Sequence, residues 1–345
     1  MVIKVIVPAI IYALFSHTEI CIAQEGHPKQ PTPMIYHNLV YHDKLDKILL
    51  FGGQSKHGWK ADLNDVWMLD PDSFSWTKIC KNEAISDSGY AAHSPIYDIE
   101  SNQIILYNQI GETWSFHVES KEWVNRKPHN SPSPRCGHNM VYNIESDKAI
   151  LFGGFECTGV NDPVFNDTWA YDYNTNTWAE LKAFNCPPSR MYASMIYNSI
   201  EDKVILWGGR VWEPLNDNSI WEFDLGDKNW AEIINGEGPE TAYAYPAMVH
   251  ITSNNRLFLF GGGKLESTFV GTPVNEAWIF DCETRKWIEV DTKNTPPPVT
   301  VHSMLYLPKA NDIVLFGGET ESMYSNNIIE GIWVLSIKDL TWDKK

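Results

Sequence analysis

Four histidines recur at one position of the chain's repeated segments, each four residues before a tyrosine, as His37 precedes Tyr41. Imidazole binds transition metals and exchanges protons near neutral pH, so converging histidines could hold a divalent metal ion or act as acid and base. Ala193 and Pro246 take this position in two further segments, which leaves the set incomplete. The alternative is that each imidazole makes hydrogen bonds within the scaffold. The four candidate metal ligands are His37, His93, His138 and His302.

Arginines and a carboxylate near the same segments widen the possible chemistry. Arg135 and Arg190 directly precede two of the segments, where a guanidinium could clamp a carboxylate or serve the scaffold. The sequence contains no Gly-x-Ser-x-Gly, His-Glu-x-x-His or Cys-x-x-Cys motif, so no catalytic motif decides between these roles. The candidate catalytic residues are His93, His138, Arg190, Arg210 and Glu156.

Composition limits the class of protein. The 345 residues are 43% hydrophobic and 21% charged, close to the values of a globular protein. Acidic residues outnumber basic ones by 44 to 27, and the formal charge of −17 argues against a nucleic-acid partner, because Lys and Arg must neutralise phosphates. No segment beyond the N-terminus has the roughly 20 apolar residues that cross a bilayer, so we expect no membrane span.

Residues 1–23 have the pattern of a secretory signal peptide. Lys4 precedes an apolar run from Val5 to Phe15, and the small residue Ala23 ends the segment. The run is too short to span a bilayer but fits the apolar region of a signal peptide. The alternative is a buried N-terminal strand or helix. We therefore expect a secreted protein, extracellular or periplasmic, with residues 24–33 as an N-terminal linker.

Tryptophans reveal an internal repeat. Twelve of the fifteen Trp form six pairs, each nine residues apart, with a period near fifty residues, which is typical of repeat architectures. Each repeat, called a unit below, carries an apolar run, two glycines in five of the six units, a loop, and then the Trp pair. The pairs are Trp67/Trp76, Trp114/Trp123, Trp169/Trp178, Trp221/Trp230, Trp278/Trp287 and Trp333/Trp342.

Each unit has the composition of four short strands, rich in Ile, Val, Phe and Trp and separated by turn residues. A single small sheet cannot bury both of its faces, whereas six sheets around an axis can, and the ring leaves no long exposed edge. The second strand is apolar at consecutive residues, as in Lys203–Trp207, which is typical of a strand covered on both faces. The sequence thus predicts an all-β, six-bladed β-propeller of four-stranded antiparallel blades.

Two glycines after an apolar strand, followed by an Asn-x-x-Trp segment and a second Trp, resemble the kelch repeat, as in Phe152-Gly-Gly and Asn166-Asp-Thr-Trp169. The resemblance covers residues 34–343 and extends to the galactose oxidase central domain and to secreted kelch proteins. It also implies that a histidine before the inner strand belongs to the scaffold. The predicted blades span 34–80, 90–126, 135–182, 190–234, 243–290 and 301–343.

The order of the predicted strands within each unit predicts two local features of the ring. Unit two has Asn108-Gln109 in place of the glycine pair, and Trp114 follows almost at once, so we expect the ring to be notched there. Unit one starts with its innermost strand near Ile35 and unit six ends with its outermost strand at Trp342. We therefore expect the first and last blades to meet by side-chain packing alone.

In a propeller, the loops between second and third strands share one face with the connections that enter each inner strand. Binding sites favour loops on a rigid scaffold, and mixed polar and aromatic groups around a depression suit a polar ligand. Arg210 and Trp212 are the preferred pair, because Trp212 is additional to the repeat. The candidate ligand-binding residues are Arg210, Trp212, Arg190, Tyr192, Lys264, Glu319, His57 and Trp59.

Five cysteines remain after the predicted leader. Cys157 and Cys186 are expected on the same face, which predicts a disulfide between them. Because five is odd, at least one thiol is free or pairs between chains.

Two functions fit these features. The first is an exported monomer that binds a protein or a glycan through its loop face. The alternative is an exported propeller enzyme that acts on an acidic sugar or another small polar substrate, similar to kelch mutarotases or polysaccharide lyases, with or without a divalent metal at the channel mouth.

Overall fold

The structure is a computed structural model that describes residues 18–20, 29–55, 65–81, 94–157, 162–211, 217–233, 238–265, 271–321 and 327–345. All regular elements in these residues are β-strands, in agreement with the predicted fold class. Over the same residues, nothing forms an apolar helix with the length needed to cross a bilayer.

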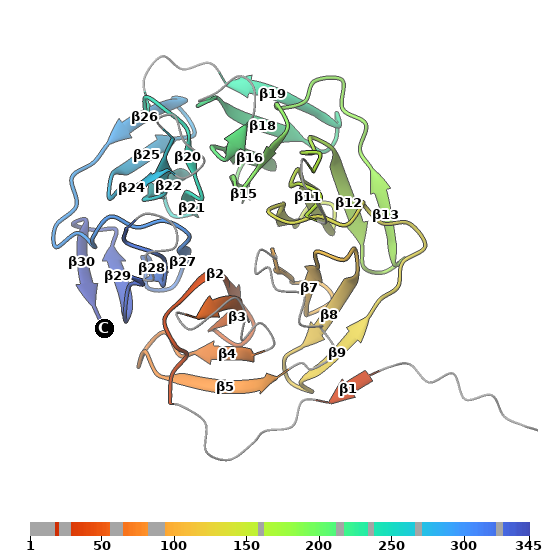
Figure 1. Ribbon diagram of the computed structural model, residues 1–345, viewed down its shortest axis with the longest axis horizontal. Coiled ribbons are helices and arrows are strands. Elements are labelled where there is room, and N and C mark those ends of the chain that lie inside the picture. The colour runs from red at the N-terminus through yellow and green to blue at the C-terminus, as the bar shows by residue number, and fades with distance from the viewer. Residues whose placement is uncertain are drawn as a thin grey trace, which may run out of the picture.

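The described strands form six large antiparallel sheets, numbered 1–6 in chain order, each of which corresponds to one unit of the sequence, and two smaller sheets. Within each sheet the strands follow one another from the inside of the ring to the outside (Figure 1). Sheets 1–3 consist of β2 (Met34–His42), β3 (Lys47–Ser55), β4 (Asp65–Leu69) and β5 (Trp76–Lys81); β6 (Ile96–Asp98), β7 (Gln103–Tyr107), β8 (Thr113–His117) and β9 (Glu122–Asn125); and β10 (Asn139–Asn143), β11 (Lys148–Phe152), β12 (Thr168–Asp172) and β13 (Thr177–Glu180).

The second half of the chain repeats this order. Sheets 4–6 consist of β15 (Ser194–Asn198), β16 (Lys203–Trp207), β18 (Ile220–Asp224) and β19 (Asn229–Ile233); β21 (Ala247–Ile251), β22 (Arg256–Phe260), β25 (Ala277–Asp281) and β26 (Lys286–Glu289); and β27 (Ser303–Leu307), β28 (Asp312–Phe316), β29 (Ile332–Ser336) and β30 (Thr341–Lys344). Short strands add β14 (Arg190–Met191) with β17 (Arg210–Val211), and β20 (Tyr243–Ala244) with β23 (Gly263–Lys264) and β24 (Thr272–Pro273).

The contact made by the second tryptophan of each pair explains why tryptophan recurs at this position in every unit. Its indole packs against the aromatic residue directly before the glycine pair, or before Asn108 in unit two, in the second strand of the preceding sheet. This contact also joins sheet 1 to sheet 6. Such aromatic pairs add to the stabilisation from burial alone. The six contacts are Trp76–Phe316, Trp123–Phe51, Trp178–Tyr107, Trp230–Phe152, Trp287–Trp207 and Trp342–Phe260.

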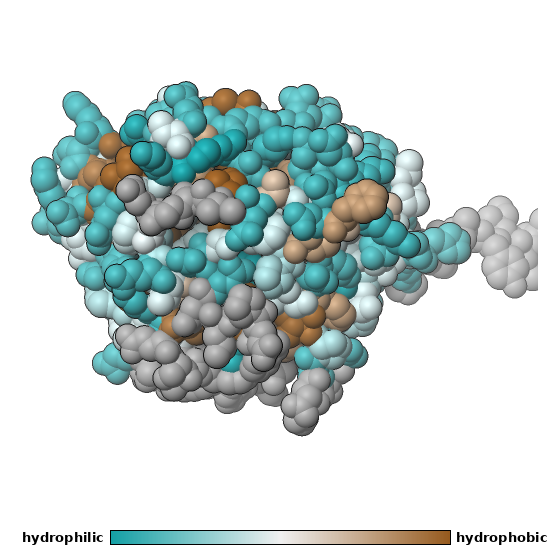
Figure 2. Space-filling model, turned by 90° about the horizontal axis from the view of Figure 1, so that it is seen from above, coloured by the Kyte–Doolittle hydropathy of each residue, from teal (hydrophilic) through white to brown (hydrophobic). Residues whose placement is uncertain are grey.

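The second strands form the most deeply buried part of the molecule. In β16 and β22, every residue after the first is buried, because the strand packs against a neighbouring sheet on each face. The outer edge is polar by comparison, and Figure 2 shows hydrophilic side chains over most of the rim in that view, with apolar ones in small groups.

Unit two has the predicted short connection. Residues 108–112 link β7 to β8, and the side chain of Asn108 accepts a hydrogen bond from the backbone N–H of Glu112 at 2.8 Å. The amide of Asn108 in turn donates to the Glu112 carboxylate at 3.1 Å. The loop-bearing end of the ring therefore lacks a long loop at this sheet, as the sequence predicts.

The junction of the first and last sheets differs from the prediction in one respect. No described strand passes from sheet 1 to sheet 6, as expected, but the two sheets do not meet by side-chain packing alone. The backbone N–H of Gly318 donates to the Met34 carbonyl at 3.0 Å, and that of Leu39 donates to the Ser303 hydroxyl at 3.0 Å. The Gly318 bond is of the same kind as the one that joins Gly154 to Arg190 at 2.9 Å. In both, the N–H of the second glycine of the pair donates to the chain that enters the next unit.

One short strand lies within the segment predicted to be a leader. The backbone of β1 (Thr18–Ile20) pairs with the outer edge of β9, with Glu19 opposite Trp123. In the intact chain this places residues 18–20 as a fifth strand of sheet 2.

Candidate functional site

The loops between second and third strands lie beside the connections that enter the inner strands, as expected. In unit four, Arg190 of β14 pairs with Val211 of β17, and in unit five Tyr243 pairs with Lys264. Isolated bridges make the same connection between Cys136 and Phe155 in unit three. We call this end of the ring the loop face, and the opposite end, with the hairpins between first and second strands, the turn face.

Three tyrosines meet on the loop face, close to the axis of the ring. The ring of Tyr245 stacks on that of Tyr192 at a centroid distance of 4.2 Å and meets that of Tyr36 edge-on at 5.6 Å. Tyr36 belongs to β2 of sheet 1, and Tyr245 directly precedes the inner strand of sheet 5. Their rings are therefore in contact although sheet 6 lies between these two sheets in the ring. The three side chains therefore narrow the loop-face end of the central channel.

Backbone geometry explains how these tyrosines reach the axis. Tyr36, Tyr192 and Tyr245 have φ values of 57°, 57° and 53°, a left-handed conformation that bulky residues seldom adopt. This conformation turns each N–H toward the preceding unit in the ring: Tyr192 donates to the Gly137 carbonyl at 2.9 Å, and Tyr245 donates to the Tyr192 carbonyl at 3.0 Å. Hydrogen bonds between units thus hold the aromatic cluster in place.

Arg210 adds a positive charge to this cluster. Its half-buried guanidinium interacts electrostatically with Tyr192 and Tyr245, while burial lowers its pKa from the usual value. The hydroxyl of Tyr245 forms hydrogen bonds with Tyr36 and Tyr192, and burial raises its pKa well above the usual value, so it remains protonated. We call these four residues the tyrosine–arginine cluster.

The described histidines pack between units. The Nε2 atom of His37 donates to the Phe316 carbonyl at 2.9 Å, and its ring meets that of Phe316 edge-on. His302 contacts Phe260, and His138 contacts Tyr107, in the same edge-on manner. Within the described part of the chain, no three His, Cys, Asp or Glu side chains form a group suited to a metal ion. These placements favour the scaffold interpretation; His93 lies outside the described residues.

We predict that this packing makes the fold sensitive to mild acid. Burial lowers the pKa of His37 to about 4 and that of His302 to about 3, below the value of about 6.5 in an unfolded chain. Because the unfolded state binds these protons first, stability is complete above pH 6.5 and falls as the pH drops toward 4. Each imidazole should cost about 2 kcal/mol between pH 6.5 and pH 5, measured by urea unfolding.

His302→Ala is the test variant, because Ala193 naturally fills the same position in unit four. It should reduce the loss in stability between pH 7.5 and pH 5, a window above the titration of ordinary carboxylates. The loss should not vanish, because burial also lowers the pKa of His37, His42 and His250. An unchanged pH dependence in this variant would contradict a buried neutral imidazole.

Arg190, predicted to bind a ligand or take part in catalysis, is committed to the scaffold. Its side chain is 1% exposed and contacts Asp217, with 2.5 Å between Nη2 and Oδ2. It also donates to the carbonyls of Gly208 and Pro188, both at 3.1 Å. Arg135 repeats the arrangement with Asp167 in unit three, at 2.6 and 2.9 Å. Both guanidiniums therefore bind a carboxylate of the chain itself and fix the entering segment.

The other candidates are dispersed over the loop face. Lys264 is half-buried with its Nζ 3.9 Å from the Glu276 carboxylate, whereas Glu319 is buried and its backbone pairs with Thr300. Glu156 lies beside Pro163, to whose carbonyl its backbone N–H donates. His57, Trp59 and Trp212 lie outside the described residues.

The predicted disulfide is wrong. Cys157 is bonded to Cys136, and Cys186 is a free thiol. The reason is that the loop of a unit pairs with the chain that enters the same unit, so Cys136 lies beside Phe155. Cys186 belongs to the connection that enters the next unit, which places it away from Cys157 along the ring.

Sequence analysis missed Tyr36 and Tyr245 of the tyrosine–arginine cluster. Both occupy the position before the recurrent histidine slot, where Gly137 and Val301 stand in other units with φ values of 62° and 58°. An aromatic residue at a position that favours glycine elsewhere in the repeat was the available signal.

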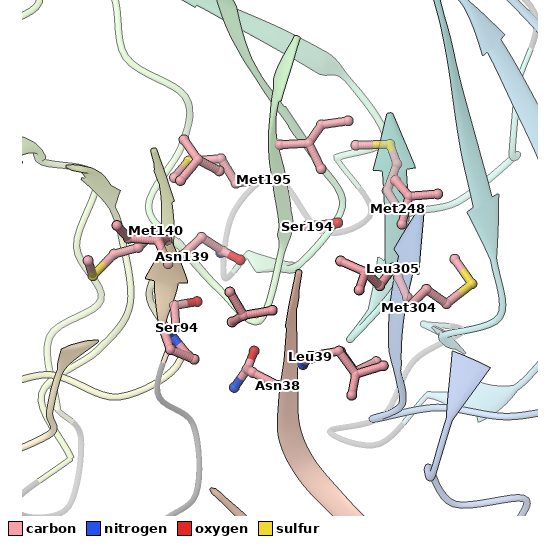
Figure 3. Close-up of a pocket in the computed structure, with 18 of the residues that line it drawn as sticks. Asn38, Leu39, Ser94, Asn139, Met140, Ser194, Met195, Met248, Met304 and Leu305 are labelled. Atoms are coloured by element: carbon pink, nitrogen blue, oxygen red, sulfur yellow. Dashed lines mark hydrogen bonds between the residues drawn. The ribbon is translucent and has the colours of Figure 1, made fainter. Parts of the chain in front are cut away.

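The inner strands enclose a channel with a volume of about 590 Å³. Figure 3 shows Asn38, Ser94, Asn139 and Ser194 around its open centre, while Met140, Met195, Met248 and Met304 point away from it. The methionines are buried between the sheets, so the channel wall consists of the alternate residues.

Comparison with known proteins shows to which family the chain belongs. A model of the KLHDC2/KLHL20/DRC7 kelch-repeats domain matches residues 9–183, 107–242 and 161–345. The dynein alpha chain of the flagellar outer arm of Chlamydomonas reinhardtii is 24% identical over 231 residues, which are 62% of this chain and 5% of that protein. Mei4-dependent protein 6 of Schizosaccharomyces pombe is 25% identical over 210 residues, 54% of this chain and 29% of that protein. The chain thus matches less than a third of either relative's length. The family model covers all six repeated units, and the chain belongs to the kelch-repeat family.

Proposed function

We propose that the six sheets form a closed six-bladed propeller that binds a protein partner through its loop face, with the tyrosine–arginine cluster at the centre of the interface. Support for closure comes from the junction of sheets 6 and 1, where Trp76 packs on Phe316 and Lys309 pairs with Asp46 at 2.7 Å. Support for a protein partner comes from the family, whose domains generally mediate protein interactions.

The cluster itself carries the proposal. Tyrosine and arginine are enriched among the residues that dominate binding energy, and they act best near the centre of an interface. Here three tyrosines are held rigidly by hydrogen bonds between units, so little conformational entropy is lost when a partner orders them. Arg210 supplies a charged group beside them that is only half-buried.

Export of the protein as a monomer is part of the proposal. The leader-like residues 1–23 support it, and so does the Cys136–Cys157 disulfide, because such bonds persist mainly in oxidising compartments. Removal of the leader would free the edge of β9 that β1 covers in the intact chain.

The test uses peptides selected on the purified chain from a phage-displayed random library. We expect Arg210→Ala to weaken the selected peptides by at least about tenfold, as for a residue near the centre of an interface. Arg256→Ala is the matched control, because Arg256 begins β22 at the turn face and its side chain is 41% exposed. Binding should be unchanged in that variant.

Peptides that bind wild type and Arg210→Ala equally would contradict the assignment of the cluster. A chain that selects no peptides but binds immobilised glycans would favour the carbohydrate alternative instead.

A further inference from the structure

The central channel has an ordered wall that the proposed partner binding does not use. One layer, here the polar ring, holds five small polar side chains and one alanine: Asn38, Ser94, Asn139, Ser194, Ala247 and Ser303. The next layer toward the turn face, here the aliphatic ring, contains Val40, Ile96, Val141, Ile196, Val249 and Leu305. Each unit supplies one residue to each layer, two positions apart, because alternate residues of extended chain share a side. Ser94 lies just before β6, and the other polar-ring residues lie in the inner strands.

The channel wall is uncharged, although the chain has a formal charge of −17. The described residues that line it include no Asp, Glu, Lys or Arg. The lining residues also include the histidines His37, His138, His250 and His302. Burial lowers the pKa of His37, His250 and His302, so these three imidazoles are neutral at pH 7. A charged ligand would lose its hydration without finding a counter-charge, so the wall selects against one.

Hydrogen-bonding groups of the polar ring remain available. Ser303 accepts from the Leu39 N–H, and the Ser94 hydroxyl donates to the His138 carbonyl at 3.4 Å. In contrast, the Asn139 amide and the Ser194 hydroxyl have no hydrogen bond to any described residue. Ser194 as a whole is only 8% exposed, and its side chain lies beside the open centre of the channel.

The two ends of the channel differ. Tyr36, Tyr192 and Tyr245 narrow it at the loop face, next to the polar ring. At the turn face, Ile144 is 46% exposed and lies with Thr252 and Pro308 along the opening. A molecule that enters from the turn face therefore passes apolar residues before it reaches the amide and hydroxyl groups.

We infer that the channel binds an uncharged amphiphile, with a hydroxyl-rich head at the polar ring and a short alkyl chain against the aliphatic ring. Its volume of about 590 Å³ suits a small molecule, for which pockets usually span about 300–1,000 Å³. A short-chain alkyl glycoside is the simplest member of this class. This site lies on the side of the tyrosines away from the proposed protein interface.

The test is isothermal titration of the full chain with hexyl β-D-glucopyranoside, below its micellar range. We expect saturable one-site binding, with hexyl sulfate and free glucose each at least about tenfold weaker, because the first adds a charge and the second lacks the chain. Asn139→Leu, which preserves side-chain size, should weaken the glucoside by about tenfold and leave the melting temperature unchanged, because the amide has no partner in the fold.

Asn174→Leu is the matched control, because Asn174 is exposed in the outer turn after β12 and is not part of the channel wall. It should bind the glucoside like wild type. Non-saturable binding, equal binding of hexyl sulfate, or full binding by a folded Asn139→Leu variant would each overturn the inference.

Discussion

Gly317→Ala is expected to prevent the ring from closing and to destabilise the protein by at least about 3 kcal/mol. Gly317 has a φ of 61°, which costs any L-residue free energy, and an added Cβ would lie 2.5 Å from the Cε1 atom of His37 and against the Met34 carbonyl. Both obstacles belong to sheet 1, and the carbonyl is backbone that cannot move aside. Urea unfolding should show the loss, or the variant should fail to accumulate as a folded species.

The control for this prediction is Gly226→Ala in the outer turn of sheet 4. Its φ lies outside the left-handed region, and an added Cβ would meet only the Asp224 side chain at 3.2 Å. This variant should remain within about 1 kcal/mol of wild type, because a flexible side chain can yield. Comparable losses in both variants would show that Gly317 matters for reasons other than the junction of sheets 1 and 6.

The all-β repeat architecture could be predicted from the sequence because the repeated residues make the contacts between neighbouring sheets. Each second tryptophan packs on the preceding sheet, and Gly317 and Gly318 contact the chain that enters sheet 1, so the spacing of these residues reports the packing directly. A repeat forces the same contact in every unit, and this makes the pattern visible in a single sequence.

The site could be predicted only in part, because its residues depart from the repeat. The rings of Tyr36 and Tyr245 are in contact although sheet 6 lies between their units in the ring. The spacing of these residues along the chain does not predict this contact. Arg190 was misassigned because its partner Asp217 lies at the far end of a connection whose path the repeat does not fix. Periodicity thus predicts neighbours within and between adjacent units, but not the partners of side chains on long loops.

The role of Arg190 leads to the second large effect. Its guanidinium is the buried link between the entering chain of unit four, the Gly208 carbonyl and Asp217, whose side chain is only 7% exposed. Arg190→Met should cost about 3–5 kcal/mol, because it leaves a buried carboxylate without its cation. The loss should appear in urea unfolding at pH 7.

A double variant distinguishes the contribution of the ion pair to stability from the contribution of packing alone. Adding Asp217→Leu to Arg190→Met removes the stranded charge and should recover about 2 kcal/mol or more, since apolar residues often replace buried pairs at little cost. Arg256→Met breaks the more exposed pair with Asp281 and should change stability by about 1 kcal/mol or less. If the double variant were no more stable than Arg190→Met, the carbonyl contacts rather than the carboxylate would explain the burial of Arg190. Recovery would instead show that this arginine neutralises Asp217 and so serves the scaffold.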